Sequence, residues 1–206
     1  MVKSGKTLSE MLHFDQIGPR TEKTIAKLLS QWLSNHPLRG LSANRNLRLG
    51  ESFTTTTLPH GIDESLEPVL TGTWVHLLRA SNRYVGYGLS KTAGPSERHW
   101  QIEAVFRASL AARLARCISW LEKSHGDVTG IVRLLIVPPY DLYAFTITHR
   151  KIVGIVVVPP ALGLKKLRPR HLYSWNDFRK SLVHEVSISG VATHQSQLVN
   201  RPRIIQ

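Results

Sequence analysis

Residues 131–158 read IVRLLIVPPYDLYAFTITHRKIVGIVVV, and this stretch decides the fold that the sequence predicts. It holds three apolar segments, IVRLLIV, DLYAFTIT and KIVGIVVV, joined by VPPYD and by a tight turn at His149-Arg150. Short runs rich in β-branched residues and bounded by turn residues favour strands. Their close spacing predicts three neighbouring antiparallel strands, a meander.

The segments on either side extend this prediction. TWVHLLRA and RYVGYGLS flank Ser81-Asn82 and predict a hairpin. Apolar residues at helical spacing in HWQIEAVFRASLAARLARCISWLEKSH, residues 99–125, predict one long helix. A last helix is predicted from SWNDFRKSLVHEV, with Ser174 as its N-cap and Asp177 in its first turn. We therefore expect an α+β fold: an antiparallel sheet of about five strands packed against one long helix, preceded by a small helical N-terminal region.

The predicted order of elements over residues 71–188, ββαβββα, resembles the roadblock and longin group of small regulatory scaffolds. That resemblance implies a homodimer that forms through the long helix or through an edge of the sheet. It leaves the function open, because similarity at the level of the fold says little about the chemistry of a protein.

The N-terminal region is predicted to be helical. TEKTIAKLLSQWLSN, residues 21–35, has apolar residues on one face of a helix, and TLSEMLHF, residues 7–14, is a shorter helix candidate. The turn-like DQIGPR separates them, so residues 7–35 resemble a helix-turn-helix unit. This resemblance slightly favours DNA as a partner, and it implies that Lys23 and Lys27 lie on the exposed face of the second helix.

Composition divides the chain into four parts. Residues 1–50 are the helical region, and residues 51–70 form an acidic linker in which Glu51, Asp63, Glu64 and Glu67 have no Lys or Arg between them. Residues 71–188 form the α+β domain, and residues 189–206 form a polar C-terminal tail. The best domain boundary lies near residue 70.

The charge of the chain indicates a polyanionic partner. Lys and Arg number 27 against 14 Asp and Glu, which leaves a net charge of +13. Nucleic acid is the first candidate, because phosphates neutralised by basic side chains release their counterions. An anionic membrane would attract the same surface.

One segment concentrates this charge. Between Leu142 and Trp175 the sequence has six Lys and Arg and no Asp or Glu, and Tyr173 and Trp175 lie near the basic residues. Cations interleaved with aromatic rings suit a phosphate backbone and stacked bases. The candidate site residues for binding nucleic acid are Arg150, Lys151, Lys165, Lys166, Arg168, Arg170, Trp175, Lys23 and Lys27. Engagement of all six cations predicts a log-log salt slope of roughly −4 to −5.

A structural or assembly protein is the alternative function. In that case the basic segment would face an anionic membrane or a ribonucleoprotein, as in a viral matrix-like protein or a particle subunit, and the tail would dock a partner. Flotation with anionic liposomes, compared with a nucleic-acid shift assay, separates the two functions.

We do not expect an enzyme. His149-x-Lys151 resembles half of the phospholipase D signature, but the aspartate that the family has five residues after the lysine is Val156 here. The histidines do not fall at metal-ligand spacings and the acids are scattered, so no metal or other cofactor is expected.

The expected location is intracellular, either in the cytoplasm or in a nucleus or nucleoid. A single cysteine, Cys117, rules out an internal disulfide and fits a reducing compartment. The N-terminal residues lack the apolar stretch of a secretory signal, and Gly154, Pro159 and Pro160 interrupt the longest apolar run.

Overall fold

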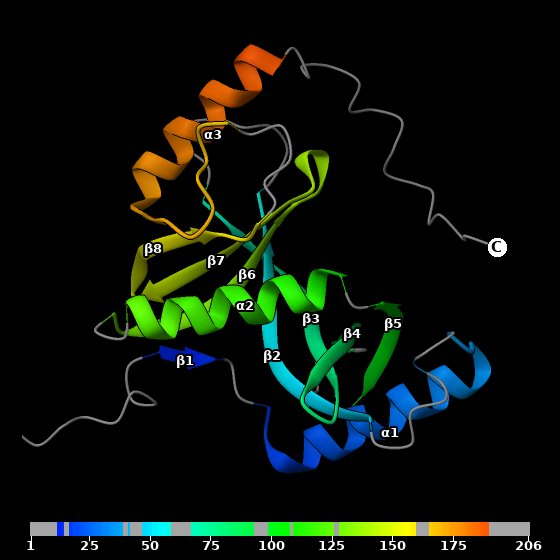
Figure 1. The fold of residues 1–206 in the computed structure, drawn as a ribbon. Helices are drawn as coiled ribbons and strands as arrows, with labels where there is room; N and C mark the ends of the chain where they lie inside the picture. The colour runs from blue at the N-terminus through cyan, green and yellow to red at the C-terminus, as the bar shows by residue number, and fades with distance from the viewer. Residues whose placement is uncertain are drawn as a thin grey trace, which may run out of the picture.

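The fold is built around one large mixed sheet, seen in a computed structural model that describes residues 12–14, 17–38, 41, 47–58, 67–92, 99–107, 109–125, 128–159 and 165–189. Within these residues the sheet has nine strands, in the order β5-β4-β3-β2-β6-β7-β8-β9, with β1 also paired to β6 (Figure 1). The strands are β1 (Leu12–Phe14), β2 (Leu47–Thr57), β3 (Val69–Ala80), β4 (Arg83–Thr92), β5 (Trp100–Arg107), β6 (Gly130–Val137), β7 (Leu142–His149), β8 (Lys151–Val157) and β9 (Leu172–Tyr173). The described helices are α1 (Pro19–Asn35), α2 (Ser109–Ser124) and α3 (Trp175–Ser189), and a short 3₁₀ turn spans Pro138–Tyr140.

The five-stranded antiparallel sheet on one long helix is therefore wrong. The sheet is larger, and it is mixed because both β1 and β2 run parallel to β6. The two strands lie along the same edge of β6, with β1 beside residues 130–132 and β2 beside residues 134–136. Over residues 71–188 the order of elements contains β5 before α2 and β9 before α3 in addition to the predicted ββαβββα. The scaffold function implied by the resemblance to the roadblock and longin group stays a prediction.

Most of the additional strands come from segments that the local pattern assigned differently. Residues 100–107, expected as the first part of the long helix, are strand β5, which pairs with β4. Residues 47–57, read as part of the helical region and the acidic linker, are strand β2. Residues 12–14, expected at the end of a short helix, are strand β1, so the predicted helix-turn-helix unit is also wrong. Each of these strands is stabilised by hydrogen bonds to a partner strand outside its own segment, which local periodicity does not report.

Several local predictions are confirmed. The helix expected at residues 21–35 lies within α1, and β3 and β4 form the hairpin around Ser81 and Asn82. Strands β6, β7 and β8 form the predicted meander. Helix α3 begins after Ser174, whose hydroxyl oxygen accepts a hydrogen bond from the Asp177 N–H at 3.1 Å and donates one to the Asp177 carboxylate at 2.6 Å.

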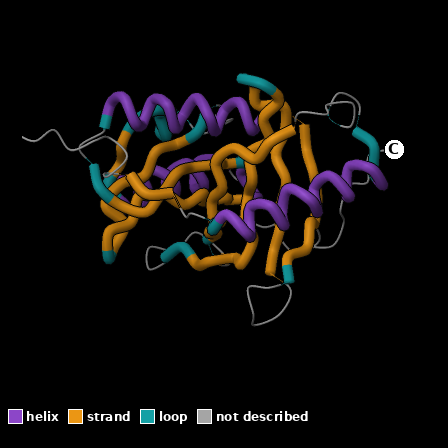
Figure 2. Tube along the Cα trace, turned by 90° about the horizontal axis from the view of Figure 1, so that it is seen from below, coloured by secondary structure: helices purple, strands orange, loops and turns teal. Residues whose placement is uncertain are grey.

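The helices cover both faces of the sheet (Figure 2). Because side chains alternate along a strand, β6 places Val132 and Leu134 against α2 and places Leu135 and Val137 in the cluster that contains residues of α3. Strand β3 makes a similar division, with Leu78 in the cluster that contains residues of α1. Helix α2 thus covers one face, and α1 and α3 cover different halves of the other face.

The remaining predictions concern membrane spans, the segments outside the described residues and the domain boundary. Described helices of the protein lack the length and apolar character needed to cross a membrane. Residues 7–11 of the predicted short helix, residues 59–66 of the acidic linker and the C-terminal tail after residue 189 lie outside the described residues. The domain boundary near residue 70 stays a prediction.

Candidate nucleic-acid interface

The basic loop, defined here as residues 165–171, connects the region after β8 to β9 and lies against α3. Its main chain returns to the sheet at Arg170, whose N–H donates to the Val157 carbonyl at 3.3 Å. Leu167 is 1% exposed and packs in one cluster with Phe178 and Leu182 of α3. The loop is therefore anchored by a buried leucine, and the residues on either side of it, Lys166 and Arg168, are exposed.

Two buried polar side chains brace the main chain of the loop. The Glu185 carboxylate of α3, which is 5% exposed, accepts a hydrogen bond from the Lys166 N–H. The Tyr173 hydroxyl of β9 accepts one from the Arg168 N–H at 2.6 Å and donates to the Lys166 carbonyl at 3.3 Å. Buried backbone groups need such partners, and these bonds hold the loop in one conformation. Neither brace occupies the charged end of Arg168.

The loop and α3 enclose an open depression with a volume of about 410 Å³. Its lining residues are Lys165, Lys166, Arg168, His171, Tyr173 and Ser181. At its side the Lys166 ammonium donates a hydrogen bond to Nε2 of His184 at 2.7 Å, since an ammonium group has no lone pair and the imidazole nitrogen is the acceptor. Three of the predicted cations thus converge on one hollow.

Arg170 belongs to the same loop but is not among the residues that line the depression. Along β9 the side chains alternate, so Leu172 packs with the α2 cluster while Tyr173 packs with the α3 cluster. Burial raises the pKa of Cys117 on α2 to about 12, and the charge of Arg170 opposes that rise.

The remaining predicted residues lie apart from the depression. Arg150 and Lys151 form the turn between β7 and β8, at the other end of β8, roughly 20 Å along the strand from Val157. Lys23 and Lys27 are exposed on α1, which lies at the opposite end of the molecule from α3 (Figure 1). The half-buried Trp175 ring stacks on Phe178, with centroids 5.9 Å apart, and supports the core beneath α3.

Sequence reasoning missed several residues of the site, namely His171, Ser181, His184 and Glu185 as lining or bracing groups. One signal was available for Glu185. It follows Phe178 and Leu182 on the apolar stripe of α3, at the spacing of one helix face. An acid on such a stripe is costly to bury without partners, so it indicates a specific hydrogen bond.

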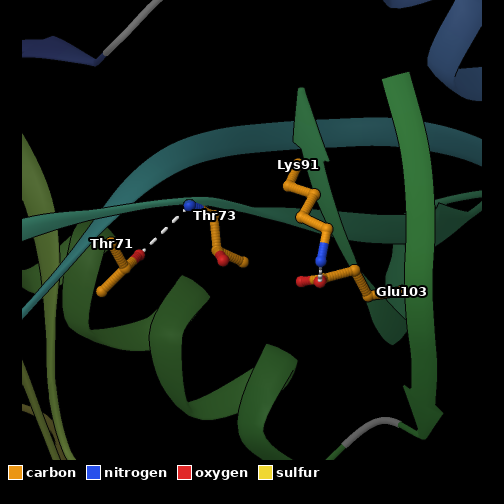
Figure 3. A network of polar contacts seen from close by, with 4 residues as sticks. All are labelled: Thr71, Thr73, Lys91 and Glu103. Atoms are coloured by element: carbon orange, nitrogen blue, oxygen red, sulfur yellow. Dashed lines mark hydrogen bonds and ion pairs between the residues drawn. The ribbon is translucent and has the colours of Figure 1, made fainter. Parts of the chain in front are cut away.

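Two other polar networks of the sheet have structural roles. His76 is fully buried and bonds Ser52 through Nδ1 at 2.8 Å and Ser90 through Nε2 at 2.7 Å. Nearby, Figure 3 shows the ion pair between Lys91 of β4 and Glu103 of β5, and the Thr71 hydroxyl accepting from the Thr73 N–H at 3.1 Å. Within the described parts of the chain, His, Cys, Asp and Glu side chains do not gather in threes that could hold a metal ion.

Comparison of the chain with models of protein families, with curated protein sequences and with solved structures gave no match. Function is therefore inferred from the geometry of the basic loop and from the charge around it.

Proposed function

We propose that this protein binds the phosphates of nucleic acid through the basic loop, without catalysing a reaction. The observation that carries the proposal is the convergence of Lys165, Lys166 and Arg168 on one depression, with the main chain between them braced by Tyr173 and Glu185. Pre-organised cations bind anions more tightly than mobile ones, because less conformational entropy is lost on binding. The loop can therefore grip phosphate without first having to order its backbone.

The surrounding charge supports the same proposal. Residues 150–189 contain eight Lys and Arg, at positions 150, 151, 165, 166, 168, 170, 179 and 180. The same range contains two acidic residues, at positions 177 and 185. Both acids have roles in local structure, since Asp177 bonds the N-cap Ser174 and Glu185 bonds the Lys166 N–H. Eight cations against two acids leave this segment with a net positive charge, which would attract a polyanion over several ångströms.

Binding through the basic loop differs from nonspecific binding caused by the net charge of the protein. A matched pair of variants distinguishes these two modes of binding. K165E/K166E/R168E reverses the charge of three side chains in the basic loop. R20E/K23E/K27E reverses the charge of three side chains on α1, at the other end of the molecule. Each variant removes three positive charges and adds three negative ones, so both change the net charge from +13 to +7. We expect the loop variant to weaken binding by about tenfold or more and the α1 variant by roughly twofold to threefold.

Fluorescence anisotropy with labelled single-stranded RNA, single-stranded DNA and duplex DNA measures this difference. Both nucleic acids are used because strand β1 removes the helix-turn-helix argument by which DNA was favoured. Contact of Lys165, Lys166 and Arg168 with three phosphates predicts a log-log salt slope of about −2 for single strands and about −3 for duplexes. Equal weakening by the two variants would contradict the proposal, and so would binding of anionic vesicles in the absence of any binding to the three nucleic acids.

A further inference from the structure

The shape of the depression indicates which kind of phosphate it takes. A chain of phosphodiesters that passes over a protein is best met by cations spread along a row or groove. Here Lys165, Lys166 and Arg168 instead surround one hollow between the loop and α3. Hydrogen-bond donors that converge on a hollow suit a phosphate at the end of a chain, which can enter the hollow.

The donors available in the hollow match an end group with several free oxygens. Lys166 uses one of its three ammonium hydrogens on His184, which leaves two and holds the flexible side chain in place. Arg168 offers a planar fork that can bind two oxygens at once, and the Ser181 hydroxyl lines the α3 side of the hollow. An internal phosphodiester has two free oxygens, whereas a terminal phosphate has three.

Charge and size agree with the same group. A phosphate monoester carries about −1.5 to −2 at neutral pH, more than the single charge of a phosphodiester, so it gains more from several cations. The volume of about 410 Å³ lies within the range of small-ligand pockets, roughly 300–1,000 Å³, and admits a phosphate together with its nucleotide. The exposed ring of His171 is in the lining, where a base could stack on it.

We propose that the depression binds the terminal phosphate monoester of a nucleic-acid strand. This inference rests on the proposed function and makes it narrower, because it assigns the loop to strand ends in preference to the interior of a strand. In this arrangement Lys165, Lys166 and Arg168 contact the phosphate oxygens, and Ser181 donates to one of them from α3.

Three 12-nucleotide probes of one sequence test the inference: one with a 5′ phosphate, one with a 3′ phosphate and one with hydroxyls at both ends. The full chain is expected to bind at least one phosphorylated probe about tenfold more tightly than the hydroxyl probe, because charged hydrogen bonds are added at one end. S181A should reduce this preference about threefold, since one such bond to the phosphate monoester is lost. S30A is the matched control, because Ser30 is an exposed serine on α1, away from the depression. Among the described residues its hydroxyl donates to the Ala26 carbonyl of the same helix. The S30A variant should keep the full preference for the phosphorylated probe.

Each outcome bears on one of the two proposals. If all three probes bind equally and K165E/K166E/R168E weakens all of them, the end-binding inference is overturned and the proposed function stands. Absence of binding to every probe overturns the proposed function, and the inference with it. Vesicles containing a phosphatidylinositol monophosphate form a further arm: loop-dependent binding to them without any preference among the probes would place the monoester on a lipid and overturn the assignment to nucleic acid.

Discussion

At the scale of single residues, His76 shows how burial controls protonation. The ring is fully buried, and both of its nitrogens are satisfied by serine hydroxyls. The rings of Trp74 and Trp100 lie near it, with centroids 6.4 Å away in each case. Burial lowers the pKa of His76 from 6.5 to about 4, because a charged imidazolium would be poorly solvated there.

This shift in pKa predicts acid sensitivity. Between pH 6.5 and pH 4 the unfolded chain takes up a proton at His76 and the folded chain does not, so the free energy of unfolding falls as the pH falls through this window. The loss is about 1.4 kcal/mol for each pH unit, and about 3 kcal/mol over the whole window. Urea unfolding at a series of pH values measures it. H76Q should lower stability at neutral pH and remove this part of the slope; an unchanged slope in H76Q would assign the acid sensitivity to other groups.

Tyr173 is the second residue that carries a prediction, because its hydroxyl joins two main-chain groups of the basic loop. Y173F keeps the ring in its packing and removes both bonds, so the Arg168 N–H and the Lys166 carbonyl lose a partner. We expect a decrease of roughly 1–2 kcal/mol in the free energy of unfolding and weaker binding to the oligonucleotide probes. Unfolding in urea and anisotropy on the same samples give both values.

A second tyrosine provides the control for this variant. The Tyr84 hydroxyl donates to the Glu51 carboxylate at 2.8 Å, far from the loop in the sequence and on another part of the sheet. Y84F should change stability without changing affinity for the probes. If Y84F and Y173F reduced the affinity equally, a specific role of Tyr173 in holding the loop would be excluded.

At the scale of elements, α3 depends on its first turn. Ser174 and Asp177 form a reciprocal cap, and the Asp177 carboxylate lies near the positive end of the helix dipole. S174A should lower the free energy of unfolding by about 1 kcal/mol, because the Asp177 N–H loses its acceptor. Hydrogen exchange at the Asp177 amide tests the mechanism directly. If that amide keeps its protection in S174A, the cap does not stabilise the helix in this way.

Strand β5 shows why local pattern misassigned an element. Ile102, Phe106 and Leu110 are spaced four residues apart, as on one face of a helix, and the sequence from His99 to His125 lacks a proline or glycine that would separate two elements. In the structure Ile102 and Val105 are buried, and Phe106 stacks on Tyr87 of β4 with centroids 4.9 Å apart. Pairing with β4 satisfies the backbone groups along one edge of residues 100–107, and that benefit depends on residues that lie earlier in the chain.

At the scale of the whole molecule, the sheet distributes the cations. The six basic residues between Leu142 and Trp175 are divided between the two ends of β8, and Lys23 and Lys27 lie on α1, at the opposite end of the molecule from α3. Three of the six, Lys165, Lys166 and Arg168, lie around the depression. The sequence predicted the basic loop and its position after a buried strand. It did not predict which cations meet, because that depends on how the folded loop lies against α3.

The sequence by itself determined the net charge, the β3-β4 hairpin, the β6-β7-β8 meander, helix α1 and the N-cap of α3. The net charge follows from composition alone, and the other features depend on contacts between residues that are close in the chain. The tertiary structure alone decided the parallel pairing of β1 and β2 with β6, the strand at residues 100–107, and the hollow that α3 and the basic loop form together. The physical reason is that backbone pairing and burial between distant segments outweigh local preference, and their partners are known only once the chain has folded.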